Sequence, residues 1–349
     1  MKLKTTKSII LFGILFTFSS AESFSQNFKD AGTYFEYVGK EFKQISNDMW
    51  DYTSASAHGK RAKTVGNKRK ELVSQINTSM SKIKSMPAFN GTTSYRDSTV
   101  SFLNLNRLVL NEDYAKIVDM EEVAEESYDA MEAYMLAKEK ADDKLKAAGD
   151  MIDSEEHKFA ADNNITLVES KDKIGKKLEE AGKVYKYTNP IYLIFFKSYK
   201  QEMYLINAQN KGDVSGMEQN KNALMQDAKE GKKKLEAIKD YKGDLTLKVA
   251  CKNMLDFYES EAKKYDDISN YFMTKEKVEK IKTSFDAKKD KEKTKSDVDQ
   301  YNAAANEFNA ANKKYNTTNQ DLNQSRSKLV DEYNNASLKL TDKFVPKRK

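Results

Sequence analysis

Hydrophobic residues recur every three or four positions along almost the whole chain, which is the spacing of one face of an α-helix. Such a stripe predicts a helix over about 31–56, a second ending near 86, a third beginning near Ser94, and a fourth ending at the sequence DNN, 162–164. The chain has only three prolines, so little interrupts the pattern. We therefore expect an all-α protein.

Capping patterns predict where several of these helices begin. A Ser, Thr, Asp or Asn side chain accepts a hydrogen bond from the first free N–H groups of a helix, and a Glu three positions later or a Pro at the first helical position strengthens the signal. The candidate caps are Asp119 with Glu122, Thr166 with Glu169, Asn189 with Pro190, and Thr274.

Two stretches 152 positions apart align without a gap. SKIKSMPAFNGTTS at 81–94 matches KKLEAIKDYKGDLT at 233–246. A second, shorter match lies 157 positions apart, between KEFKQ at 40–44 and KSYKQ at 197–201. We interpret these matches as an internal duplication that gives two tandem antiparallel four-helix units in an elongated molecule. The aligned residues Phe89 and Tyr241 are expected to close the ends of the two bundles.

The expected division of the chain follows from the repeat. It comprises a leader at 1–25, a first helical unit at 26–163, a connecting helix at 164–187 and a second unit at 188–349. The apolar run IYLIFF, 191–196, is expected to be a helix segment buried where the two units meet.

Residues 301–328 fall into four groups of seven, which predicts a long C-terminal, coiled-coil-like helix. Each group begins with a large residue followed by Asn, and its fourth position is small. Large and small residues at alternating seam positions suit a closely packed antiparallel helix pair. The helix either runs unbroken from 275 to about 342 or is interrupted by the Lys-rich stretch 287–297. The candidate interaction surface is Tyr301, Asn302, Phe308, Asn309, Tyr315, Asn316, Leu322 and Asn323.

The first 25 residues have the composition of a secretory signal peptide. Three lysines precede a ten-residue apolar core, and small residues follow. Cleavage is expected after Ala21 or after Ser25. The core is too short to span a membrane, so we expect an exported protein of the periplasm, cell surface or medium without a transmembrane span.

Charge is balanced and evenly spread. Removing residues 1–25 takes away three lysines and Glu22, which lowers the net charge from +6 to +4. Lys is interspersed with Asp and Glu in the remaining chain, which is typical of a solvated helical surface and does not favour a basic patch for nucleic acid.

Few residues are suited to catalysis or metal binding. Cys251 lies on an apolar helix face, where a buried packing role is expected, and it has no partner for a disulfide within the chain. Asp153 and His157 share a helix face but have no third ligand nearby. We expect neither an enzyme nor a cofactor or metal site.

The leader, the paired KEFKQ and KSYKQ helices and the continuous helical periodicity resemble uncharacterised exported helical surface proteins of Gram-negative bacteria. This resemblance implies a cell-envelope location and no catalytic residues.

Three functions remain open. The first is a non-catalytic secreted or envelope module that interacts with an unknown protein partner or is structural. The alternatives are a membrane-active helical protein of the pore-forming kind and a protein that binds a ligand or glycan, between the duplicated units or along the Asn residues of the heptads. The sequence leaves the oligomeric state open.

Overall fold

The computed structural model describes residues 28–59, 61–167 and 173–347, and this part of the chain is helical without a β-strand. The predicted all-α fold is confirmed. The expected leader and the Glu169 half of one capping box lie outside the described residues. The first group of helices is α1 (Ala31–Ala57), α2 (Ala62–Lys84), α3 (Ser94–Leu108), a π-helical turn (Val109–Asp113), α4 (Tyr114–Ala124) and α5 (Tyr128–Asp162).

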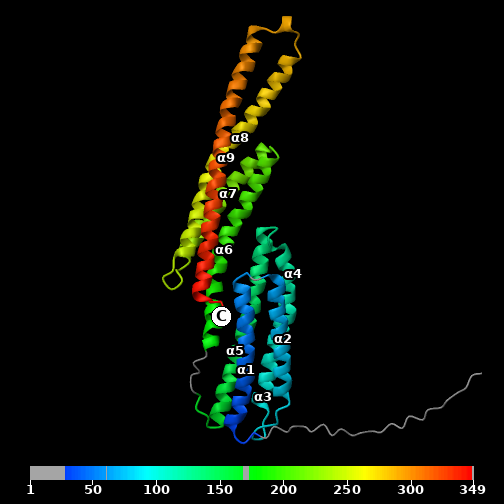
Figure 1. The fold of residues 1–349 in the computed structure, drawn as a ribbon, viewed down its shortest axis with the longest axis vertical. Helices are drawn as coiled ribbons and strands as arrows, with labels where there is room; N and C mark the ends of the chain where they lie inside the picture. The colour runs from blue at the N-terminus through cyan, green and yellow to red at the C-terminus, as the bar shows by residue number, and fades with distance from the viewer. Residues whose placement is uncertain (1–27, 60, 168–172, 348–349) are drawn as a thin grey trace, which may run out of the picture.

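The second group contains the longest helices and forms an extended rod (Figure 1). Helices α8 and α9 pair antiparallel along their length, while α6 and α7 cover only part of that pair. The elements are α6 (Lys173–Asn210), α7 (Val214–Ala237), α8 (Thr246–Asp286), a short 3-10 turn (Asp290–Glu292) and α9 (Lys295–Phe344). The long C-terminal helix is therefore confirmed, and the Lys-rich stretch 287–297 interrupts the helical run, because α8 ends at Asp286 and α9 begins at Lys295.

The same tight turn follows α2 and α7. Asn90 and Gly91 have φ values of 48° and 76°, and Lys242 and Gly243 have 53° and 79°. Two positive φ values in succession are the geometry of a type I′ turn, in which glycine carries no steric penalty. Since α3 and α8 begin at Ser94 and Thr246, the sequence alignment of these turns holds residue by residue.

Aromatic rings close the bundle ends at these turns, as expected from the sequence. The ring of Phe89 lies 5.2 Å from Tyr34 of α1 and 5.9 Å from Phe159 of α5. The ring of Tyr241 lies 5.4 Å from Tyr187 of α6 and 5.0 Å from Phe344 of α9. Each turn therefore anchors two other helices of its own group.

The predicted helix break at Asn189 and Pro190 is wrong, because α6 continues through Pro190. A proline inside a helix removes one backbone hydrogen bond. Burial of Tyr187, Ile191 and Ile194 on both sides of the proline offsets this loss. The connecting segment and the first helix of the second unit are thus one continuous helix.

Two other predicted helix starts are also wrong. Asp119 lies inside α4, and α5 begins after Ser127, whose hydroxyl accepts a 3.1 Å hydrogen bond from the Ala130 N–H. Thr274 lies inside α8, where its hydroxyl donates back to the Asn270 and Tyr271 carbonyls.

Helix α6 joins the two groups. It packs on α1 and α5 of the first group and on α7, α8 and α9 of the second. Within the IYLIFF segment, Phe196 packs with Ala124 and Met131 of the first group, whereas Ile191 and Phe195 belong to the core of the second group. This segment lies where the two groups meet, as predicted.

Candidate functional site

The large heptad residues of α9 form the seam with α8. The ring of Tyr315 stacks on Tyr271 at 4.2 Å, and Tyr301 stacks on Phe285 at 5.3 Å. Phe308 lies 5.7 Å from Tyr271. Leu322 belongs to the buried core of the second group. The large members of the predicted interaction surface therefore pack within the chain.

The asparagines of the heptads face solvent. Asn302, Asn309, Asn316 and Asn323 are exposed, and Asn306 and Gln320 extend the same helix face. We call these six residues the amide stripe. Asn323 accepts a hydrogen bond from Arg326, whereas no hydrogen bond is described for the side chains of Asn302, Asn309 and Asn316. A role of the stripe in binding stays a prediction.

Beyond Phe272 the α8–α9 hairpin stands clear of α6 and α7 (Figure 1). Gly212, in the α6–α7 loop, lies against the Phe272 ring and marks the end of the covered part. We call residues 273–313 the distal hairpin. On the α8 side of the distal hairpin, Glu276, Glu279 and Thr283 are exposed. Polar side chains therefore occupy the helical turns of α8 that α6 and α7 do not contact.

The two lysines of KSYKQ connect the groups of helices. Lys197 lies 5.9 Å from the centre of the Tyr128 ring and 2.8 Å from Asp227, whose hydrogen bond raises the pKa of Lys197. Lys200 is buried and donates a 3.0 Å hydrogen bond to the Glu125 carbonyl at the end of α4, where a cation is favoured. In the matching KEFKQ the lysines are exposed.

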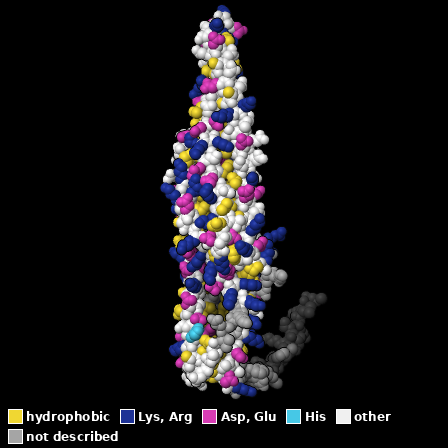
Figure 2. Space-filling view, turned by 90° about the vertical axis from the view of Figure 1, so that its left-hand side faces the viewer, with side chains coloured by type: hydrophobic (Ala, Val, Ile, Leu, Met, Phe, Trp, Pro, Cys, Tyr) yellow, Lys and Arg dark blue, Asp and Glu magenta, His cyan; other side chains and the backbone are white. Residues whose placement is uncertain are grey.

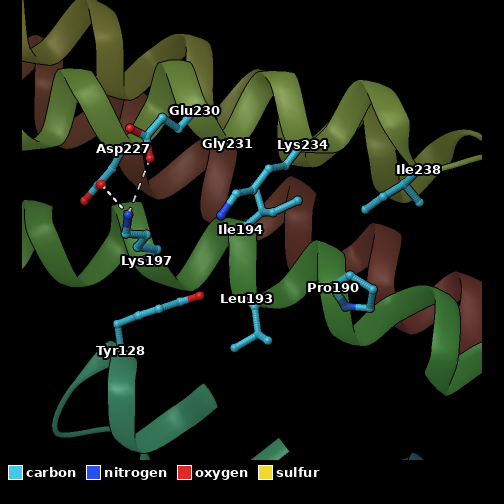
Figure 3. A pocket seen from close by; sticks show the side chains of 10 residues that line it. All are labelled: Tyr128, Pro190, Leu193, Ile194, Lys197, Asp227, Glu230, Gly231, Lys234 and Ile238. Carbon is cyan, nitrogen blue, oxygen red and sulfur yellow. Dashed lines mark ion pairs between the residues drawn. The ribbon is translucent and has the colours of Figure 1, made fainter. Parts of the chain in front are cut away.

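A pocket of about 270 Å³ lies at this junction (Figure 3). Tyr128 approaches from α5, Leu193 and Ile194 lie on α6, and α7 supplies the opposite wall. Lys197 pairs with Asp227 and Glu230 at one end. An apolar pocket with a few polar groups is the usual form of a small-molecule site.

A second cluster, missed by the sequence reasoning, is buried in the core of the second group. Glu202 of α6 is 1% exposed and Glu261 of α8 is fully buried. The guanidinium of Arg326 on α9 donates through Nε to Glu202 and through Nη2 to Glu261. The sequence does contain a signal for the burial of Glu261, because this residue lies at helical spacing between Tyr258 and Tyr265 on one apolar stripe that also includes Met254.

Other chemically interesting side chains are placed as follows. Cys251 is fully buried, burial raises the pKa of its thiol to about 12, and its Sγ lies 3.8 Å from the Ile191 carbonyl, so its predicted packing role is confirmed. His157 lies 3.6 Å from Asp153 at the surface. Within the described ranges, three or more His, Cys, Asp or Glu residues nowhere form a group able to hold a metal ion.

The face of the molecule in Figure 2 carries both signs of charge along its length. In the part of the chain that the structure describes, every helix is too short or too polar to cross a membrane. Comparisons with protein-family models, curated proteins and solved structures gave no match to the chain.

Proposed function

We propose that this chain is a non-catalytic, exported helical module of the cell envelope or medium that presents the distal hairpin to a protein partner. The observation that carries the proposal is the extension of α8 and α9 beyond α6 and α7 (Figure 1). A hairpin whose flanks are uncovered offers a long surface on a rigid helical support.

The seam of the distal hairpin supports this role. Stacked rings and small residues hold the two helices together without help from other elements: Phe285 pairs with Tyr301, and Ala304 and Ala311 are buried between the helices. The outer positions are therefore not needed to close the pair. Exposed amides both donate and accept hydrogen bonds, so the amide stripe suits a polar protein surface.

Shortening the hairpin tests the proposal. Lys277 and Glu307 face each other at 2.6 Å, so residues 278–306 can be replaced by a four-residue Gly-Ser loop between them. The shortened protein should keep its helicity and melting temperature nearly unchanged and lose the partners captured from native envelope extract by the mature protein. Retention of all those partners would contradict the proposal.

Point variants locate the contact more closely. Asn302→Ala, Asn306→Ala and Asn309→Ala together should reduce partner capture. The matched control is Asn334→Ala with Asn335→Ala, which removes exposed amides from the same helix outside the distal hairpin. Equal loss in both variants would contradict a specific role of the distal hairpin.

A second candidate function is binding of a small amphiphilic ligand in the junction pocket. It is favoured by the pocket's position between Tyr128 of the first group and α6–α7 of the second. Leu193→Gln, in the pocket, should abolish saturable binding of anilinonaphthalene sulfonate, and Leu338→Gln, at an exposed site on α9, should not. Equal binding by both variants would contradict this candidate.

A further inference from the structure

Three charged side chains from three helices meet in the core of the second group. Glu202 comes from α6, Glu261 from α8 and Arg326 from α9. The guanidinium donates to both carboxyl groups and, through Nη1, to Asn323. These contacts join α9 to the two helices beneath it.

The charges in this cluster do not balance when both acids are ionised. Two carboxylates would face one guanidinium, which leaves one negative charge in the core. Burial of an uncompensated charge is costly, and two carboxylates that share a site resist simultaneous ionisation.

The neighbouring helices offer no second cation among the described contacts. Lys221 and Lys232 of α7 pair with other carboxylates of α8, at Asp266 and at Asp256 with Glu259. On α8 itself, Lys263 and Lys264 are exposed. The other titratable groups that face the cluster are phenols: Tyr199 of α6, and Tyr258 and Tyr265 of α8.

Two buried polar atoms at the cluster have no hydrogen-bond partner. They are Oε2 of Glu261 and the hydroxyl oxygen of Tyr258, and both side chains are fully buried. A carboxylate oxygen can only accept, whereas a protonated carboxyl group can donate. A proton on Glu261 would turn its orphaned oxygen into a donor.

We propose that Glu202 and Glu261 share one bound proton at neutral pH and that this proton keeps α9 packed on α6 and α8. The neutral carboxyl group of Glu261 donates to Glu202, and Arg326 compensates the single remaining negative charge. Loss of the proton to solvent at alkaline pH leaves two carboxylates on one guanidinium and loosens the contact of α9 with the bundle.

The electrostatics of Glu261 agree with this geometry. Burial raises the pKa of Glu261 and the adjacent Glu202 raises it further, while Arg326 opposes the shift. In the unfolded chain a glutamate titrates near pH 4.3. Between that pH and the raised value, the folded protein binds the extra proton, so stability falls as pH rises.

The test is the pH dependence of unfolding in wild type, Glu261→Gln and Glu202→Gln. A one-proton difference raises the unfolding equilibrium constant by up to about tenfold per pH unit. Each substitution removes the shared proton, so both variants should show a shallower fall in stability between pH 5 and 9. The control is Glu276→Gln on the same helix, which removes an exposed carboxylate paired with Lys280 and should keep the wild-type slope.

Carbon-13 NMR of glutamate carboxyl groups in the wild-type protein provides a readout that does not depend on the variants folding. One glutamate should remain protonated at pH 7, well above the pH range in which a glutamate side chain ordinarily loses its proton. Full ionisation of every glutamate by pH 7, or equal slopes in wild type and both core variants, would overturn the proposal.

Discussion

The two groups of helices treat a buried acid differently. In the first, Glu41 of KEFKQ is buried and receives hydrogen bonds from Ser79 at 2.6 Å and Lys82 at 2.9 Å. Burial would raise the pKa of Glu41, but the bonds from Lys82 and Ser79 outweigh it and hold the pKa below its ordinary value. In the second, Glu202 and Glu261 share one arginine.

This difference shows that two groups of helices can share the same turns and end rings and still differ in the charged residues of their cores. The turns at Gly91 and Gly243 and the rings of Phe89 and Tyr241 serve the same purpose in both groups. The core charges differ, and in the second group α8 and α9 extend into an uncovered hairpin. The second group therefore combines a protonatable core with the surface proposed to bind a partner.

The largest expected contrast between the two groups comes from removal of the cation that pairs with the buried acid in each. Arg326→Met leaves buried acids without a partner and should lower the free energy of unfolding by about 3–5 kcal/mol. Lys82→Met removes a lysine that is half-exposed and should cost about 1 kcal/mol or less. Urea unfolding measures both losses in free energy, and equal losses would contradict the proposed difference between the two cores.

The turns should respond alike. Gly91→Ala and Gly243→Ala place a side chain at φ values of 76° and 79°, where open space surrounds the new Cβ but the backbone is unfavourable. Each should cost about 1 kcal/mol of unfolding free energy. Thermal unfolding of both variants measures the two losses. A several-fold difference between the losses in unfolding free energy would contradict the equivalence of the two turns.

The smallest contrast concerns two buried tyrosines. Tyr34→Phe removes a hydroxyl that donates to the Pro87 carbonyl at 3.1 Å and should cost about 1 kcal/mol. Tyr258→Phe removes a hydroxyl without a described partner and should be neutral or slightly stabilising. A larger loss at Tyr258 in urea unfolding would reveal a partner for this hydroxyl.

The sequence predicted the helical class and the repeated turns because these depend on local patterns. The spacing of apolar residues sets helix formation locally, and Gly91 and Gly243 set the turn geometry locally. Both signals can therefore be recognised without knowledge of the fold. The end rings at Phe89 and Tyr241 followed from the same alignment.

The errors arose where distant contacts decide the outcome. Pro190 favours a helix start, yet α6 packs on both groups and continues through it. Thr274 has the side chain of a cap, but α8 extends past it in contact with α9. Tertiary packing outweighed the local preference in both cases.

The buried acids were hidden for a related reason. Glu202 and Glu261 each occupy an apolar stripe, but their meeting point depends on how α6, α8 and α9 pack. Arg326 is the one arginine of α9 among many lysines, and only the fold shows that it reaches both acids.

The number of protons released on unfolding is the most direct measure of the difference between the two cores. At pH 7, urea unfolding in weakly buffered solution with an indicator dye should release about one more proton from wild type than from Glu261→Gln. Glu41→Gln should leave the wild-type release unchanged, because Glu41 is ionised in both states. Equal release by wild type and Glu261→Gln would contradict a proton held in the core of the second group.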